Sequence, residues 1–155
     1  MSKAEKYLNV IEAFKGTLAA NLPAGIHLTN ISALLKKEFD FFWVGFYLAS
    51  ETDELVIGPY QGEVPCFYIK HGKGVCGTAA KTGKSQIVGD VHSFPGYIAC
   101  HPEPQSEIVI PGMKEGKCLF VLDVDHIEKN YFDEVDEQML SQICELIVNR
   151  EIVSK

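Results

Sequence analysis

Two stretches in the middle of the chain have the pattern of β-hairpins. The run FFWVGFYLA (41–49) is aromatic and β-branched, stops at ETDE and is followed by ELVIGPYQG. Further along, SEIVIPG and KCLFVLDVDH flank the turn MKEG. Apolar runs joined by short polar turns indicate antiparallel partners, because a parallel pair needs a long crossover. The sequence therefore predicts an antiparallel sheet.

Amphipathic helices are predicted on either side of this sheet in the sequence. Residues 3–18 and 27–39 carry apolar side chains at intervals of three and four, and Asp133 can cap a third helix with an apolar stripe. Between the hairpins we expect a short strand at 66–70, a short helix in GVCGTAAKTG and another extended piece in SQIVGD. The result is an α+β fold, a central antiparallel sheet with the N- and C-terminal helices packed on one face.

Length and charge limit the classes of function. At 155 residues and 46% apolar content, we expect a single domain over residues 1–155. The formal charge of −7 repels a phosphate backbone, so no nucleic acid partner is expected. No apolar run is long enough for a membrane span and no secretory signal pattern is present, which predicts a cytoplasmic protein with no membrane partner.

The segment HGKGVCGTAAKTGKS (71–85) is close to two phosphate-binding patterns. Gly72, Gly74 and Gly77 have G-x-G-x-x-G spacing, but a dinucleotide site needs a parallel strand-helix-strand unit and hairpins are predicted here. Five residues separate Gly77 from Gly83, where a P-loop has four. Nucleotide binding stays the weaker alternative, and we expect the glycines to serve tight turns.

Five cysteines are many for an intracellular chain of this size, and their odd number argues against a secreted disulfide framework. Cys118 lies in a predicted strand and Cys144 in a predicted helix, where buried thiols act as small apolar side chains. Cys66, Cys76 and Cys100 lie beside Pro and Gly in predicted loops, where reactive thiols need to be.

These loop cysteines suit zinc less well than redox chemistry. No C-x2-C pair is present, so zinc is a weak alternative and no metal or other bound cofactor is expected. Cys76 follows glycines at the start of a short helix, where the dipole favours a thiolate, and Cys100 is beside His101, which can stabilise negative sulfur. In a redox cycle one thiol becomes a sulfenic acid and a second condenses with it.

Three acidic residues are predicted to meet on the second hairpin. Asp123 and Asp125 are two residues apart in one strand and point to the same face, while Glu107 opens the adjacent strand. In a shared pocket, repulsion and desolvation would raise at least one carboxyl pKa and leave a proton donor near neutral pH. A solvated strand end is the alternative explanation.

With these residues, the sequence resembles the free methionine-(R)-sulfoxide reductases, which are built on a GAF domain. Over roughly residues 27–148, the matching stretches are WVGFYL, IGPYQG, GKGVCGTAA, DVHSFPGYIAC, SEIVIP and VLDVD. The cysteine spacing agrees, with Cys76 ten residues after Cys66 and Cys100 twenty-four after Cys76. The resemblance implies a GAF-like fold and reduction of the free amino acid sulfoxide, not of oxidised methionine within a protein.

The resemblance also implies how the cysteines divide the reaction. Cys100 attacks the sulfoxide sulfur of free methionine sulfoxide, and Cys66 captures the resulting sulfenic acid as a disulfide. Thioredoxin, the implied partner and external reductant, then restores the thiols. Cys76 belongs to the same set, either as a second resolving thiol or as a participant in the attack.

Other matched positions are implied to bind the substrate. Glu107, Asp123 and Asp125 correspond to the acidic cluster of the family, which would protonate the sulfoxide oxygen and receive the ammonium group. Trp43 and Tyr47, four residues apart and therefore on one face of their strand, correspond to an aromatic wall for the S-methyl group. Trp43 would also suit an ordinary core position.

The sequence departs from the family pattern at four positions. Tyr97 stands where the family has His, and His101 stands where it has Asp, which reverses the expected charge beside Cys100 and leaves the pH optimum open. Leu119 and Phe120 replace Ile-Gly and would narrow the pocket.

Two other functions remain open, a non-catalytic GAF module that binds a small ligand and a thiol redox sensor. Closure of the 91–105 loop would explain why only the free amino acid is a substrate. Pairing through the terminal helices would make a homodimer.

Overall fold

The computed structural model describes residues 1–153 and confirms the predicted α+β fold. The strands are β1 (Trp43–Ala49), β2 (Glu54–Gln61), β3 (Tyr68–Lys70), β4 (Gln86–Val88), β5 (Ser106–Lys114) and β6 (Lys117–His126). The α-helices are α1 (Lys3–Thr17), α2 (Ala24–Phe39), α3 (Gly74–Thr82) and α4 (Glu134–Asn149). The strands form one antiparallel sheet in the order β3-β2-β1-β6-β5-β4.

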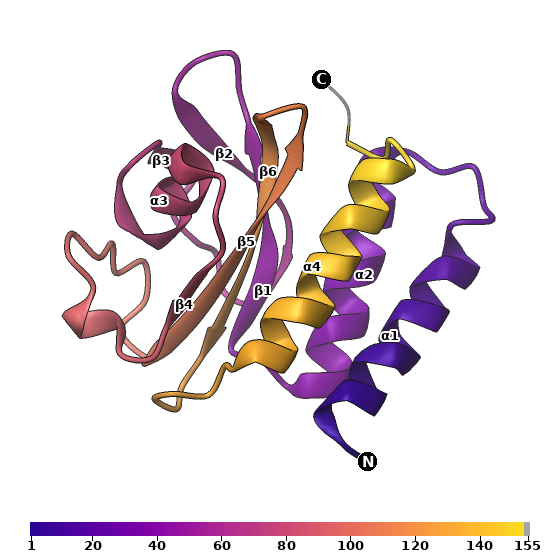
Figure 1. The fold of residues 1–155 in the computed structure, drawn as a ribbon, viewed down its shortest axis with the longest axis horizontal. Coiled ribbons are helices and arrows are strands. Elements are labelled where there is room, and N and C mark those ends of the chain that lie inside the picture. The colour runs from indigo at the N-terminus through magenta and orange to yellow at the C-terminus, as the bar shows by residue number, and fades with distance from the viewer. Residues whose placement is uncertain (154–155) are drawn as a thin grey trace.

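The terminal helices cover one face of this sheet. Figure 1 shows α1, α2 and α4 side by side to the right of the strands, with α3 and the segment between β4 and β5 on the other side. Inward side chains of the helices, among them Leu35 and Ile143, pack with Phe46 and Leu122 from the sheet. A second buried cluster lies on the opposite face and includes Trp43 and Tyr47. Alternation along β1 and β6 supplies both clusters, because successive strand residues point to opposite faces.

Helix α4 begins where the sequence predicts a cap. The Asp133 carboxylate accepts hydrogen bonds from the backbone N–H groups of Val135 and Asp136, so it replaces partners that the first turn lacks. Asp136 is fully buried and accepts from the Tyr7 hydroxyl at 2.6 Å and from Lys3 Nζ at 2.7 Å. These bonds join α1 to α4 and satisfy a carboxylate that would otherwise be costly to bury.

Several boundaries differ from the predictions; β1, for example, starts at Trp43 rather than Phe41. Helix α2 starts at Ala24 rather than residue 27, immediately after Pro23. Strand β3 starts at Tyr68 rather than residue 66, because the Cys66 carbonyl accepts from the Tyr47 hydroxyl instead of joining the sheet. The turn between β5 and β6 contains only Glu115 and Gly116, with φ of 51° and 78°, a geometry whose twist matches the flanking strands.

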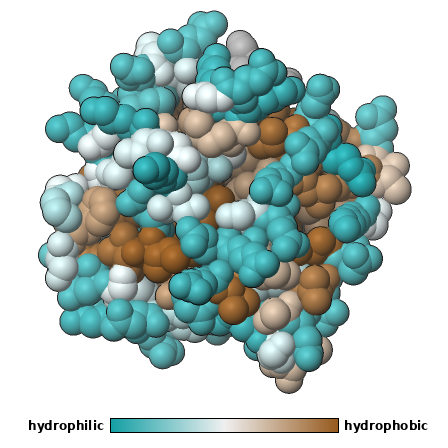
Figure 2. All heavy atoms as spheres, viewed as in Figure 1, coloured by the Kyte–Doolittle hydropathy of each residue, from teal (hydrophilic) through white to brown (hydrophobic). Residues whose placement is uncertain are grey.

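The described residues contain no helix that is both long and apolar enough to cross a membrane. Figure 2 shows that hydrophilic side chains cover most of the face seen in Figure 1, with apolar side chains gathered in separate patches between them. Apolar surface on this face is therefore divided by polar groups.

Candidate active site

A cleft opens on the face of the sheet that the terminal helices leave free. It has about 470 Å³ of empty volume, including solvent at its mouth. Its walls come from β1, β3, β5, β6, the start of α3, the segment before β3 and the loop before β5. The lining residues are Trp43, Tyr47, Pro65, Ile69, Lys73, Gly74, Val75, Cys76, Tyr97, Ile98, Cys100, His101, Pro104, Glu107, Asp123 and Asp125. All eight predicted site residues except Cys66 are among them, and Cys66 is bonded to Cys100.

Cys66 and Cys100 form a disulfide at this cleft. They are 34 residues apart in the sequence, and their Cα atoms lie 5.6 Å apart. Both residues are half-buried, so a reductant can approach the bond from solvent. The pairing is the one implied by the family resemblance.

The three predicted carboxyl groups converge. In the β5–β6 pair, Glu107 lies opposite Asp125. Asp123 precedes Asp125 by two residues and therefore lies on the same face of β6. Burial raises the pKa of Glu107 well above its ordinary value, and the charges of Asp123 and Asp125 raise it further. Burial likewise raises the pKa of Asp123, and burial together with the charge of Asp123 raises that of Asp125. Among residues 1–153, Asp123 Oδ1 is one of three buried side-chain polar atoms without a hydrogen-bond partner.

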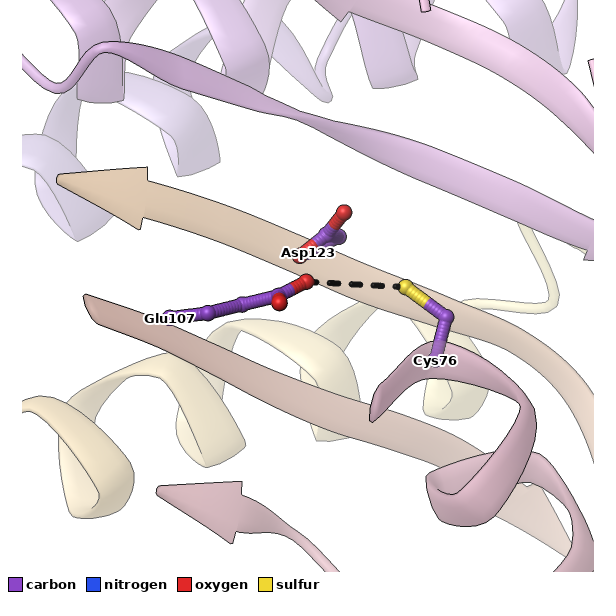
Figure 3. Close-up of side chains that lie close together, drawn as sticks. All are labelled: Cys76, Glu107 and Asp123. Carbon is purple, nitrogen blue, oxygen red and sulfur yellow. Dashed lines mark hydrogen bonds between the residues drawn. The ribbon is translucent and has the colours of Figure 1, made fainter. Parts of the chain in front are cut away.

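Cys76 lies beside this acidic cluster. Figure 3 shows its Sγ pointing from α3 toward Glu107 on β5, with Asp123 of β6 next to both. The Sγ atom lies 4.0 Å from Glu107 Oε2, and only 4% of the residue is exposed. Burial raises the pKa of the Cys76 thiol well above its ordinary value, and the charges of Asp123 and Glu107 add to the effect.

Cys76 lies in the short helix that the sequence predicts over GVCGTAAKTG. The prediction of a thiolate was wrong, because the environment of Cys76 favours the neutral thiol. The helix dipole acts in the predicted direction, but loss of water and two nearby acids outweigh it.

One thiol and two carboxyl groups could also serve as metal ligands. One ligand atom each from Cys76, Glu107 and Asp123 lie within 4.8 Å of one another. All three groups have raised pKa values, which disfavours the ionised forms that bind a cation. The same shifts favour protonated groups, which suit acid catalysis.

Trp43 and Tyr47 form an aromatic wall of the cleft. Their ring centroids lie 5.9 Å apart with an angle of 27° between the planes, and both residues are buried. Trp43 Nε1 donates to the Glu63 carbonyl at 3.0 Å, and the Tyr47 hydroxyl donates to the Cys66 carbonyl at 2.9 Å. Sequence patterns placed the rings on one face but gave no signal for these two backbone contacts.

Two residues of the 91–105 loop that depart from the family pattern, Tyr97 and His101, also line the cleft. Tyr97 lies near the acids, and burial followed by the charge of Glu107 raises its pKa. His101 Nε2 lies 3.1 Å from the Val64 carbonyl oxygen, and its ring packs edge-on against Phe42. The loop thus contacts the segment before β3 through a side chain as well as through the disulfide.

The prediction that Leu119 and Phe120 narrow the pocket was wrong. Both belong to the core cluster under the terminal helices and neither lines the cleft. The Phe120 ring packs against Phe46 and over Gly112, on the opposite face of the sheet.

The glycines near Cys76 serve turns, as predicted, and one of them also serves close packing. Gly72, Gly74 and Gly83 have positive φ values of 81°, 63° and 69°, which glycine adopts at little cost. A Cβ atom at Gly77 would clash with the Lys70 carbonyl, so this glycine lets α3 approach β3.

The remaining cysteines are buried and unpaired in the described structure. Burial raises the pKa of Cys118 to about 11 and raises that of Cys144 further. Their predicted role as small apolar side chains agrees with these positions.

Comparison with known proteins identifies close relatives along almost the whole chain. Residues 29–149 match the GAF domain family. "GAF domain-containing protein A" of Dictyostelium discoideum is 47% identical over 96% of this chain and 94% of its own. "Free methionine-R-sulfoxide reductase" of Saccharomyces cerevisiae is 40% identical over 100% of this chain and 90% of its own.

A solved structure agrees in both fold and sequence. The X-ray structure of free methionine-R-sulfoxide reductase from Neisseria meningitidis, in complex with its substrate, superposes with a TM-score of 0.93. It is 39% identical, and the match covers 97% of this chain and 90% of that one.

Proposed function

The chain belongs to the GAF-domain free methionine-R-sulfoxide reductases, and we propose that it reduces free L-methionine (R)-S-oxide to L-methionine. The observation that carries the proposal is the disulfide between Cys66 and Cys100, which adjoins a cleft lined by three carboxyl groups of raised pKa. Such a cleft combines the sulfur that accepts oxygen with the acids that this transfer needs.

In the proposed first step, the Cys100 sulfur attacks the sulfoxide sulfur while a carboxyl group protonates the sulfoxide oxygen. The hydroxyl group is then transferred to the Cys100 sulfur, and the bonds from the substrate sulfur to Cys100 and to oxygen both break, which releases methionine and leaves Cys100 as a sulfenic acid. Cys66 then attacks the Cys100 sulfur, water leaves, and the disulfide forms. Methionine gains the two electrons that the thiol pair loses.

Glu107 is the preferred proton donor. It is buried, its pKa is raised by burial and by two neighbouring acids, and it faces the cleft. Sulfoxide oxygen must gain a proton as the S–O bond breaks, so a carboxyl group that stays protonated near neutral pH lowers this barrier.

We propose that Cys76 supports the reaction without acting as the attacking or the resolving thiol. Its buried, neutral thiol beside Glu107 is a poor nucleophile, since only the thiolate attacks readily. A second resolving function would require it to move away from the acids and ionise.

The two ends of a free amino acid can be recognised separately. Asp123 and Asp125 can accept hydrogen bonds from the substrate ammonium group. At the start of α3, Gly74 and Val75 line the cleft, and the first N–H groups of a helix favour an anion such as the substrate carboxylate. Trp43 and Tyr47 would pack against the S-methyl group.

A methionine sulfoxide residue within a polypeptide has neither the free ammonium group nor the free carboxylate. Amide groups in place of the ammonium and carboxylate would leave these buried positions without charged partners. Tyr97 and Ile98 of the loop line the cleft. The rest of a polypeptide substrate would have to fit in the space that they occupy. Selectivity for the free amino acid follows from this arrangement.

Thioredoxin is the proposed reductant. The half-buried disulfide is accessible to an attacking thiolate, and a thioredoxin cycle fits a cytoplasmic location, where thiols are kept reduced. A homodimer, expected through the terminal helices, stays a prediction that light scattering can check.

The test is a coupled thioredoxin assay on the separated R and S forms of free methionine sulfoxide and on the R form within a peptide. We expect turnover of the free R form alone, and its loss in Cys100→Ser. Cys118→Ser is the matched control, because Cys118 is buried outside the cleft. Undiminished turnover in Cys100→Ser would overturn the assigned nucleophile.

A further inference from the structure

Three side chains hold the backbone around Cys66. Trp43 Nε1 donates to the Glu63 carbonyl at 3.0 Å, and the Tyr47 hydroxyl donates to the Cys66 carbonyl at 2.9 Å. His101 Nε2 lies 3.1 Å from the Val64 carbonyl oxygen, where its N–H form donates. Two of the anchors come from β1, and the third comes from the residue after Cys100.

The Phe67 carbonyl accepts a hydrogen bond from the Ile57 N–H of β2, but the residues before it lie outside the sheet and depend on the side-chain contacts. Strand β2 ends at Gln61 and β3 begins at Tyr68, so Cys66 is in the connection between them. Val64 and Phe67 on either side are more than half exposed. A connection with little buried surface of its own is free to move unless its backbone is bonded elsewhere.

We infer that Tyr47 and His101 are positioning residues for the resolving step. The Tyr47 hydroxyl fixes the backbone of Cys66, and His101 fixes the backbone two residues earlier, so that the Cys66 thiol stays within reach of oxidised Cys100. The inference rests on the proposed function, in which Cys100 becomes the sulfenic acid and Cys66 resolves it. It adds a second task to Tyr47, whose ring forms part of the cleft wall.

The step that they assist is the condensation of two sulfurs. The Cys66 sulfur attacks the Cys100 sulfur, the S–O bond of the sulfenic acid breaks, and hydroxide leaves and takes up the proton of the Cys66 thiol as water. The rate of such a step depends on how often the two sulfurs are in contact, so fixing one backbone raises the rate without touching the substrate.

The key variant is Tyr47→Phe, which keeps the ring and removes only the hydroxyl. Tyr60→Phe is the matched control, because Tyr60 also stacks on Trp43 but has no side-chain hydrogen bond among the described residues. His101→Ala removes the contact with the Val64 carbonyl, and His101 is half-buried. This variant tests the inference if Tyr47→Phe folds poorly. Thermal unfolding of each oxidised variant checks that it is folded.

Each reduced protein is treated with free methionine sulfoxide and, separately, with hydrogen peroxide, which oxidises Cys100 without methionine sulfoxide. Quenched samples are analysed by mass spectrometry for disulfide, for the dimedone adduct of the sulfenic acid and for methionine. The measured quantity is the rate of disulfide formation relative to the rate of sulfenic acid formation.

We expect this ratio to fall by about two- to tenfold in Tyr47→Phe and in His101→Ala, the range that one hydrogen bond contributes. Trapped sulfenic acid should increase in both variants, and Tyr60→Phe should match the wild type. An unchanged ratio in the folded variants would overturn the inference, and so would an equal loss of both steps.

The peroxide experiment separates this inference from the proposed function. If the wild type releases no methionine from the sulfoxide, the proposed function fails. A peroxide-driven disulfide that still slows without the Tyr47 hydroxyl would support the positioning role in that case as well.

Discussion

Glu107 on β5 lies directly opposite Asp125 on β6, and both side chains line the cleft beside the Cys66–Cys100 disulfide. Two buried carboxyl groups that lie opposite each other on neighbouring strands cannot both ionise easily, because little water is present to screen their charges. Protons are therefore held where the proposed reaction consumes them.

The acid role of Glu107 can be tested with Glu107→Gln. The amide keeps the shape but cannot transfer a proton, so kcat/KM for free methionine (R)-sulfoxide should fall by about 10² to 10⁴. The thioredoxin-coupled assay measures the fall. Glu12→Gln, on the exposed surface of α1, should leave the rate unchanged. A Glu107→Gln enzyme with more than half the wild-type rate would exclude Glu107 as the required acid.

The raised carboxyl pKa values also predict how stability changes with pH. Glu107, Asp123 and Asp125 have folded pKa values above their unfolded ones. Above the unfolded pKa, the unfolded chain holds fewer protons than the folded one, so raising the pH favours unfolding. Their contribution is fully present below the unfolded pKa values and is lost as the pH rises through the folded ones.

Urea unfolding of the oxidised protein between pH 4 and pH 9 measures this dependence, in the pH range above the usual carboxyl pKa of about 4. The wild type should lose more stability across this range than Glu107→Gln, because the variant has one fewer proton to release. Parallel curves for the two proteins would mean that Glu107 titrates normally.

Removing the resolving thiol should stop the cycle after one turnover. With Cys66→Ser, reduced protein should form about one equivalent of methionine per chain and accumulate the sulfenic acid of Cys100, which has no partner thiol. Rapid quench with dimedone trapping counts both products. Cys144→Ala, a buried thiol outside the cleft, should retain repeated turnover. Continued turnover in Cys66→Ser at the wild-type rate would assign resolution to another cysteine.

Gly112 on β5 is predicted to be essential for packing under the terminal helices. A Cβ atom there would clash with the Phe120 ring, so Gly112→Ala should lower the free energy of unfolding by about 1–3 kcal/mol. Gly16→Ala is the matched control, since a Cβ atom in that turn of α1 has open space. It should raise stability by about 0.5–1 kcal/mol through helix propensity. Denaturant unfolding of both variants provides the comparison, and equal stability of Gly112→Ala and the wild type would contradict the packing argument.

Local patterns in the sequence determined the elements. The cap at Asp133 and the apolar stripe predicted α4, and the period of two placed Asp123 and Asp125 on one face of β6. These features depend on the repeat of the backbone and on nearby side chains, so a sequence contains them directly.

The tertiary structure alone decided which distant groups meet and how much water they keep. Spacing did not predict that Cys66 would lie beside Cys100, since the pairing came from the family resemblance, and no pattern indicated that Tyr47 would hold the Cys66 carbonyl. Cys76 is the clearest case. Its local sequence favoured a thiolate, yet packing against β5 and β6 buries the sulfur beside two acids, and a pKa depends on solvation and charges that only the complete fold brings together.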